Sequence, residues 1–265
     1  MATRPIGVGW ALRFKPMIAR PLARTFAVAI TAFAGVPALA APACDVPGVL
    51  PTVRMEAPSD REPRRLLPIG GYTLSLIWLP QQCRANGAGF ACGERRTAGF
   101  VLHGLWPDGK EKDWPQWCNA APVLPVATIK AHYCATPSPQ LIQHEWAKHG
   151  TCMAGYTPER YFALSNRLFD GFKQPDLRRL STRPATVASV QRAIAAGNPG
   201  LRSDMMRLNL DRDGWLQEVW LCLDTGFKPN VCPAYQGGAQ AADRVQIWRG
   251  GRSEATRRRR FATRS

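Results

Sequence analysis

Four ionisable side chains lie close together in one short stretch of the chain, HEWAKHGTC, from His144 to Cys152. An α-helix turns by about 100° per residue. Relative to the first histidine, Lys148, Glu145 and His149 therefore point at about 40°, 100° and 140°. Imidazole, carboxylate and ammonium groups on one broad face can move protons and bind an anion. This stretch is the first candidate for a catalytic site.

The other side of the same helix is apolar. Ile142 and Trp146 point at roughly 160° and 200°, so we expect them to pack inward while the charged residues face a cleft. Gly150 permits the helix to end, and Cys152 can anchor that end by a disulfide.

Two other interpretations of this helix are possible. The zinc signature HExxH has its histidines at i and i+4, whereas here they stand at i and i+5. Their imidazoles should diverge by about 140° instead of about 40°, and Lys148 would place a positive charge beside a metal. A solvated charged face is the default for a generic helix. The distribution of histidines argues against a solvated face, because three of the four histidines in the chain lie either in this stretch or in one other short stretch.

That other stretch is FVLHGLWPDG, from Phe100 to Gly109. Its first three residues read as the end of a buried strand. His103 is expected at the C-terminal end of that strand, where Gly104 lets the backbone turn. A short loop with an aromatic plane and a carboxylate should follow, formed by Trp106, Pro107 and Asp108.

The patterns FxxHGLWP and HEWxKHGxC, in this order and about forty residues apart, resemble the two signature segments of the ribonuclease T2 family. Both match without departure, and the resemblance covers roughly residues 68 to 248. It implies an α+β fold with a mainly antiparallel sheet. It also implies an endoribonuclease that acts on single-stranded RNA without a metal or other cofactor.

Such an enzyme needs only to move two protons, because RNA carries its own nucleophile in the 2′-OH. The resemblance implies His149 as base and His103 as acid, although the spacing itself does not distinguish them. The products would be a 2′,3′-cyclic phosphate and then a 3′-phosphate. Lys148 can stabilise the transition state, and His144 can bind the phosphate. Glu145 belongs to the site by resemblance, whether protonated, paired with the lysine or orienting a histidine.

The resemblance assigns Trp106, Pro107 and Asp108 to the base-binding subsite, with a stacking face and a hydrogen-bond acceptor. Trp114 either adds a second face or lies in the core. For the downstream base, Trp78 stands roughly where plant members of the family carry glutamine. The selectivity for that nucleotide is therefore open.

The periodicity of the chain predicts one α+β domain, with a central, mainly antiparallel sheet packed by helices. Tyr72 to Trp78 should belong to a central strand within Gly71–Pro80, followed by a glycine-rich loop between two cysteines. His132 is expected on a helix surface, outside the site. The remaining elements are expected as helices at about 123–133, 157–172, 175–181 and 186–196, and strands at 205–210, 215–223 and 244–248.

Eight cysteines indicate disulfides formed in an oxidising compartment. The resemblance favours two pairs, proximity in the sequence favours a third, and two cysteines remain. The expected pairs, in that order, are Cys118 with Cys152, Cys222 with Cys232, Cys83 with Cys92, and Cys44 with Cys134.

We expect four regions: a signal peptide at 1–40, a proline-rich lead-in at 41–67, the catalytic domain at 68–248 and a disordered basic tail at 249–265. The formal charge of +16 falls to +5 for residues 41–248, which hold 23 basic and 18 acidic side chains. The run Arg257–Arg260 can strengthen attraction to phosphates or be a solvated tail, and both remain open.

These features predict a secreted protein, periplasmic or extracellular, that acts as a monomer on RNA with no membrane or obligate protein partner. Two alternatives differ in class. A non-catalytic family member with a binding or storage role would be expected to lack His103 or His149, and a zinc hydrolase would lose activity to a chelator.

The apolar run from Phe26 ends in Ala38-Leu39-Ala40, an A-x-A cleavage site. Signal peptidase should therefore cut after Ala40, even if translation begins at Met17. Amino-terminal sequencing of the secreted protein should begin at Ala41. A different first residue would correct the cleavage site, and a retained segment would contradict a signal peptide.

Overall fold

The structure is a computed structural model that describes residues 44–86, 92 and 99–250. The expected signal peptide and all but the first two residues of the expected basic tail lie outside these residues. No helix in the described part of the chain is both long enough and apolar enough to span a bilayer.

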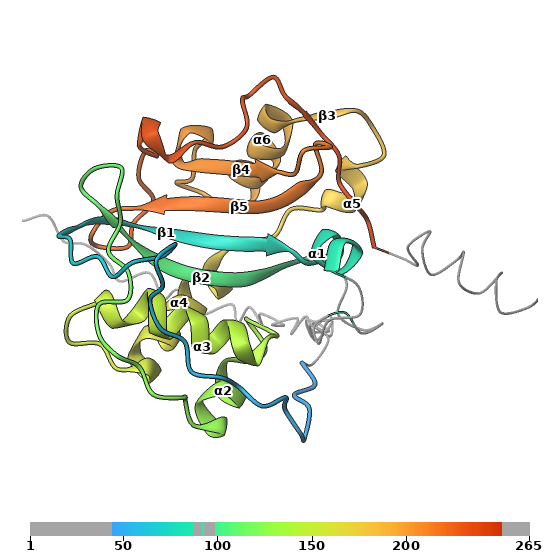
Figure 1. Cartoon of the computed structure of the whole chain (residues 1–265). Coiled ribbons are helices and arrows are strands. Elements are labelled where there is room, and N and C mark those ends of the chain that lie inside the picture. Colours follow the sequence, from blue (N-terminus) through green and yellow to red (C-terminus); the bar gives the residue numbers. More distant parts are fainter. Residues whose placement is uncertain (1–43, 87–91, 93–98, 251–265) are drawn as a thin grey trace, which may run out of the picture. The chain divides into compact units, whose positions relative to one another are not determined.

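A four-stranded antiparallel sheet forms the centre of the described fold (Figure 1). Its strand order is β2-β1-β5-β4, so β1 is a central strand as expected. A small second sheet pairs β3 with β6. The strands are β1 Ile69–Trp78, β2 Phe100–Gly109, β3 Ala185–Thr186, β4 Met206–Leu210, β5 Leu216–Leu223 and β6 Arg244–Val245.

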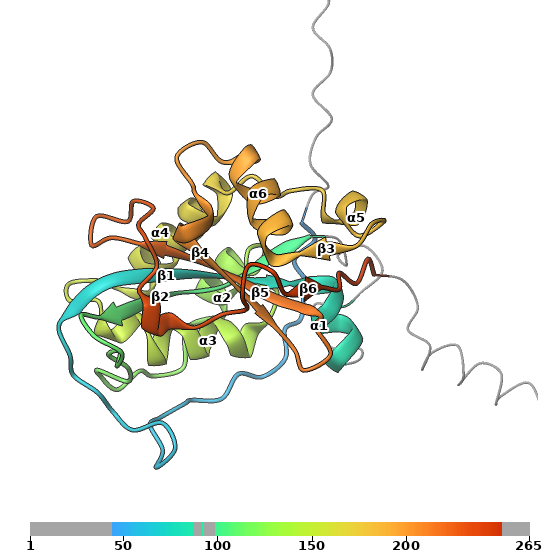
Figure 2. The ribbon, with the colours of Figure 1, turned by 90° about the horizontal axis from the view of Figure 1, so that it is seen from above.

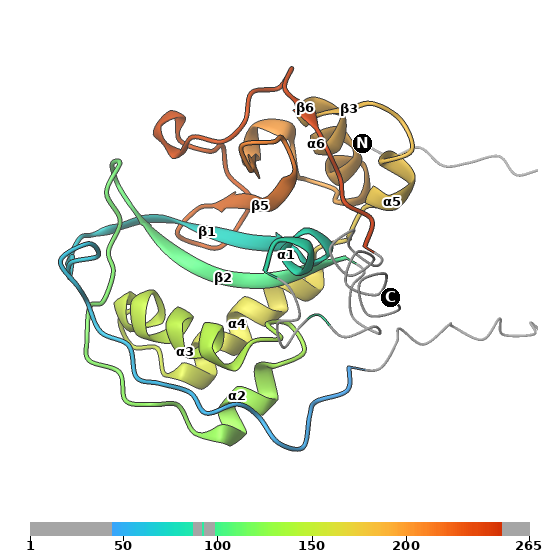
Figure 3. The same cartoon turned by 45° about the vertical axis from the view of Figure 1, so that its right-hand side comes forward.

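Helices pack at both ends of the strand order. Helices α2, α3 and α4 lie on the β2 side, whereas α6 lies near β4 and α5 lies near β3 (Figures 1 and 3). The helices are α1 Leu79–Asn86, α2 Val126–His132, α3 Pro139–Lys148, α4 Pro158–Gly171, α5 Leu177–Leu180 and α6 Val187–Gly197. This arrangement confirms the expected α+β class.

Helix α3 begins where its sequence permits. The Ser138 side chain accepts a hydrogen bond from the backbone N–H of Leu141, and Pro139 occupies the first turn. A serine cap satisfies a free N–H group, and proline at the first turn sacrifices no helical hydrogen bond. Thr157 and Pro158 start α4 in the same way.

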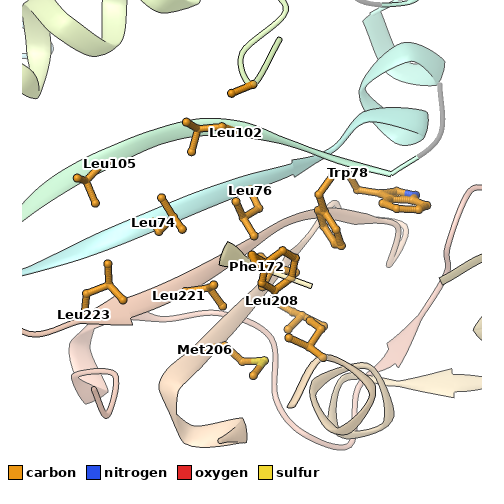
Figure 4. Close-up of a cluster of buried hydrophobic side chains, with 14 of the residues drawn as sticks. Leu74, Leu76, Trp78, Leu102, Leu105, Phe172, Met206, Leu208, Leu221 and Leu223 are labelled. Carbon is orange, nitrogen blue, oxygen red and sulfur yellow. The ribbon is translucent and has the colours of Figure 1, made fainter. Parts of the chain in front are cut away.

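One face of the sheet carries the hydrophobic core. Figure 4 shows leucines from four strands converging there, among them Leu76 of β1, Leu102 of β2 and Leu208 of β4. Helices α4 and α6 cover this face with residues such as Tyr161 and Ile194. The opposite face of β1 carries the polar side chains of Thr73 and Ser75, so the sheet lies between the core and these polar groups.

Strand β2 differs from the sequence-based expectation. It continues to Gly109 instead of ending at His103. The register pairs Gly104 with Ser75 but Leu102 with Leu76, so His103 is an additional residue in a β-bulge. A bulge shifts the alternation of side chains, which is why strict alternation did not predict a strand through this segment.

Two further boundaries were wrong. The expected strand at 71–80 ends at Trp78, and α1 takes up Leu79, Pro80 and Cys83; proline is tolerated in a first helical turn. The expected strand at 244–248 is reduced to Arg244–Val245, with one further bridge from Gln246 to Trp215.

All four expected disulfides are present: Cys44–Cys134, Cys83–Cys92, Cys118–Cys152 and Cys222–Cys232. The first ties the lead-in to the segment that follows α2. The third fixes the chain beyond the C-terminal end of α3 to the loop after β2. In Figure 2, viewed from above, the lead-in can be followed along the edge of the helices.

Helix α3 depends on Ile142, whose side chain is fully buried in the core. Ile142→Ala should lower the free energy of unfolding by about 2–5 kcal/mol, because it removes buried carbon atoms and leaves a cavity. Denaturant unfolding measures this loss. The control Leu66→Ala removes as many carbons from a side chain that is 61% exposed, and its effect should stay within about 0.5 kcal/mol. Equal effects would contradict the assignment of α3 to the core.

Candidate active site

A cleft with a volume of about 460 Å³ opens on the polar side of the sheet. Strands β1, β2 and β5 form one wall, and α3 with its C-terminal cap forms another. Eight of the predicted site residues line it: His103, Trp106, Asp108, Trp114, His144, Glu145, Lys148 and His149. The bulge in β2 makes this possible, because it brings His103 and Trp106 to the same face.

His103 is held between two carboxylates. Its Nδ1 lies 2.7 Å from Oε1 of Glu218 on β5, and its Nε2 lies 3.5 Å from Oε1 of Glu145 on α3. Burial alone would lower the pKa of His103. The hydrogen bond to Glu218 and the charges of both carboxylates outweigh burial and raise that pKa above its usual value.

Glu145 lines the cleft, as expected, and its side chain is buried. Its Oε2 accepts a hydrogen bond of 2.8 Å from Nε1 of Trp106. A Cβ atom at position 104 would lie 1.7 Å from this oxygen, so only glycine permits the close approach. Burial raises the pKa of Glu145, against the opposing charges of His103, His144 and Lys148.

His149 has an environment opposite to that of His103. It caps α3, is buried, and stacks on the indole of Trp106 with ring centroids 5.4 Å apart. Burial lowers the pKa of His149 well below its usual value, and the charges of Lys148, His144 and His103 add to this effect. The ring of His103 meets the same indole edge-on at 5.0 Å. One tryptophan therefore contacts both histidines, of which one favours the protonated form and the other the neutral form.

The lead-in contributes two acidic side chains that the sequence did not reveal. Glu56 Oε2 lies 2.5 Å from Nδ1 of His144, and Glu62 Oε1 lies 2.6 Å from Nζ of Lys148. Glu56 is also held by Gln140. The lead-in is extended, as expected, and crosses α3 in Figure 1. Both side chains that could bind a phosphate, His144 and Lys148, therefore already have carboxylate partners.

The expected base-binding residues occupy another part of the cleft. Asp108 accepts a hydrogen bond of 2.7 Å from the hydroxyl of Thr73, which in turn accepts one from Gln236. Burial raises the pKa of Asp108 to about 6, and the bond from Thr73 opposes this rise. Trp114 is 42% exposed at the edge of the cleft, with the guanidinium of Arg65 4.4 Å from its ring. Trp114 is therefore a cleft residue and not a core residue.

Three residues discussed from the sequence do not line this cleft. Pro107 is buried in β2, on the face that alternates away from Trp106 and Asp108. Trp78 is a core residue whose Nε1 donates to the carbonyl of Trp248. His132 stacks on Phe162, 4.9 Å away, outside the cleft.

One group of donors could approach a cation. Nitrogen and oxygen atoms of His144, Glu145 and His149 lie within 4.8 Å of one another. The expected divergence of the two imidazoles does not hold, because the helix ends at Lys148 and His149 leaves the ideal rotation. Lys148, however, adds a positive charge beside these donors, and His144 and Glu145 each already use one atom for a protein partner. The group therefore does not have the character of a metal site.

The sequence did not point to Glu218 or Trp220 of β5, nor to Thr73, Tyr235 and Gln236. Apart from Glu218 they all line the cleft, and Glu218 contacts it through His103. A signal existed for Glu218, which is a charged residue within the largely apolar strand LQEVWLCL. A charge at such a position is costly unless it is paired, but its partner could not be identified without the sheet order.

Comparisons with known proteins agree with this geometry. The model of the ribonuclease T2 family matches residues 69–232. A Haemophilus influenzae protein named a probable ribonuclease is 33% identical over 180 residues, which is 62% of this chain and 61% of that protein. An Aeromonas hydrophila ribonuclease is 33% identical over 162 residues, which is 58% of this chain and 71% of that protein.

A solved structure shares the fold. Trichomaglin, described as an S-like ribonuclease, superposes with a TM-score of 0.54 at 19% identity, over 68% of this chain and 97% of its own. The family model matches more than half of the present chain, with both histidine motifs inside the matched range. The chain therefore belongs to the ribonuclease T2 family.

Proposed function

We propose that the protein is a secreted, metal-independent endoribonuclease that cleaves single-stranded RNA through its 2′-OH. One observation carries the proposal: His103 and His149 contact the same indole in one cleft, and their environments shift their pKa values in opposite directions. Two titratable groups whose pKa values are separated in this way can serve as acid and base.

His149, which favours the neutral form, is the base. It takes the proton from the 2′-OH while the 2′-oxygen forms a bond to phosphorus. His103, which favours the protonated form, donates a proton to the 5′-oxygen as the bond from phosphorus to that oxygen breaks. A 2′,3′-cyclic phosphate results, and water opens it to a 3′-phosphate with the two roles exchanged.

Negative charge grows on the non-bridging oxygens during this step, so nearby cations stabilise the transition state. Lys148 supplies a positive charge there, and the imidazole of His144 can bind the phosphate. RNA phosphate would compete with Glu62 and Glu56 for them. Glu145 orients His103 and Trp106 through its contacts with both.

The base 5′ to the cleaved bond is proposed to stack on Trp106 or Trp114, with Asp108 accepting a hydrogen bond from an exocyclic amine. Bases must be unpaired to stack in this way, so single-stranded RNA is the substrate class. The four disulfides suit an oxidising compartment. We propose a periplasmic or extracellular location after removal of residues 1–40, with the enzyme acting as a monomer.

The test of this function is digestion of single-stranded RNA in the presence of a chelator, followed by analysis of the product ends. We expect cyclic and then 3′-phosphate ends, because the nucleophile is the neighbouring 2′-oxygen. His103→Ala and His149→Ala should each lower kcat by at least about 100-fold, since each removes one proton transfer.

The control is His132→Ala, because His132 lies outside the cleft and its loss should leave cleavage unchanged. Folding of each variant is checked by circular dichroism. Loss of activity to the chelator would support a zinc hydrolase instead. Absence of cleavage by the folded wild type would support a non-catalytic family member.

The raised pKa of Asp108 predicts a change in base preference with pH. Above its pKa of about 6 the carboxylate accepts a hydrogen bond from the amine of adenine or cytosine. As the pH falls through this value the carboxyl becomes protonated, and KM for those bases should rise relative to KM for uracil, which has no such amine. The ratio cancels titrations that affect all substrates equally.

The matched variant Asp108→Asn keeps the size of the side chain but does not titrate. Its KM ratio should be independent of pH from 5 to 7. A ratio that changes equally in the variant and the wild type would exclude Asp108 as the source.

A further inference from the structure

Glu218 lies on β5, whereas the two histidine motifs lie on β2 and at α3, yet it contacts His103. Strand β1 lies between β2 and β5, so the two side chains meet across a third strand. Ser75 stands below them on β1, where its register partners are Gly104 of β2 and Trp220 of β5. The hydroxyl of Ser75 lies close enough to donate a hydrogen bond to the Glu218 carboxylate.

The Glu218 carboxylate is itself held in place. Its Oε2 accepts hydrogen bonds from Nε1 of Trp220 at 2.6 Å and from the Ser75 hydroxyl at 3.2 Å. Its Oε1 remains for Nδ1 of His103, at 2.7 Å. Burial alone would raise the pKa of Glu218, but the bond from His103, its charge and the two other donors lower that pKa below its usual value. The carboxylate is therefore ionised and can only accept hydrogen bonds.

An ionised acceptor at this place determines the tautomer of His103. The proton must be on Nδ1, and Nε2 is the atom that faces Glu145 and the cleft. A carboxylate in contact with the distal nitrogen of a catalytic histidine orients the ring and stabilises the imidazolium. The other charged groups that face His103 are Glu145 and Lys148 on α3 and His149 at its cap.

We propose that Glu218 is the positioning residue of His103: it fixes the Nδ1–H tautomer, directs Nε2 to the departing 5′-oxygen and holds the ring protonated until that proton is donated. The inference rests on the proposed function. Glu218 does not touch the substrate and acts only through His103, so it should affect the departure of the leaving group and not substrate binding.

Two substrates test this inference, an RNA dinucleotide and a nucleoside 3′-(p-nitrophenyl phosphate). A 5′-oxygen needs a proton to leave, whereas p-nitrophenolate is stable and leaves without one. Glu218→Gln should lower kcat on the dinucleotide by about 10- to 1,000-fold, a range typical of catalytic proton transfer, with KM changed little. On the p-nitrophenyl ester, the fold-decrease in kcat should be less than about one tenth of the fold-decrease on the dinucleotide, because its leaving group needs no proton.

The pH profile supplies a second readout. Removing the carboxylate lowers the pKa of His103, so the alkaline limb of kcat/KM on the dinucleotide should move to lower pH in Glu218→Gln. Glu218→Asp keeps the charge but draws the carboxylate back from Nδ1. Glu218→Asp should show a smaller shift of the alkaline limb and a smaller decrease in kcat. It also provides a second variant if Glu218→Gln does not fold.

The matched charge control is Asp170→Asn, which removes one exposed carboxylate at the end of α4 and should change neither the profile nor the substrate ratio. In His103→Ala, the further change Glu218→Gln should cost nothing more, because residues that act through one another are not additive.

Separate outcomes contradict the two proposals. Full activity of His103→Ala would overturn the proposed function. If His103→Ala is inactive, the inference about Glu218 is wrong when folded Glu218→Gln has the same alkaline limb of kcat/KM as the wild type. It also fails if both substrates lose activity equally, or if the double variant loses more activity than His103→Ala.

Discussion

The β-bulge at His103 is the constraint on which the site depends. A regular strand through residues 100–109 would place His103 and Trp106 on opposite faces of the sheet. The additional residue between the Leu102 and Gly104 pairs restores both to the polar face while Leu102 and Leu105 remain in the core. Bulges commonly redirect side chains beside active sites. Here the bulge lets one strand present Leu102 and Leu105 to the core and His103 and Trp106 to the cleft.

The buried carboxylate of Glu145 connects that strand to α3. It lies over Gly104, accepts from Trp106 and faces His103. Because the helix is fixed on its other side by Ile142 in the core, and the chain beyond it by Cys118–Cys152, the distance between the two histidine motifs is set by packing that carries no chemistry. This rigid support suits a reaction that depends on the placement of two protons.

The lead-in has a closer relation to the site than its composition suggested. It lies outside the range matched by the family model, yet Glu56 and Glu62 contact His144 and Lys148, which line the cleft. An ion pair in partly solvated surroundings contributes little to stability. The two contacts instead fix the positions of His144 and Lys148 at the wall of the cleft.

The sequence by itself determined the two motifs, the α+β class, the helix start at Thr157 and the candidates His103 and His149, and the resemblance to the ribonuclease T2 family added Glu145. The class and the helix start follow from periodicity and capping, and the motifs from the chemistry of side chains within a few residues of one another. The tertiary structure alone decided the bulge, the burial of Glu145, the opposite environments of the two imidazoles and the contact of His103 with Glu218. Each of these depends on which strands are neighbours and on what removes water from a group. Residues 103 and 218 are brought together only by the sheet order, and no local pattern encodes that order.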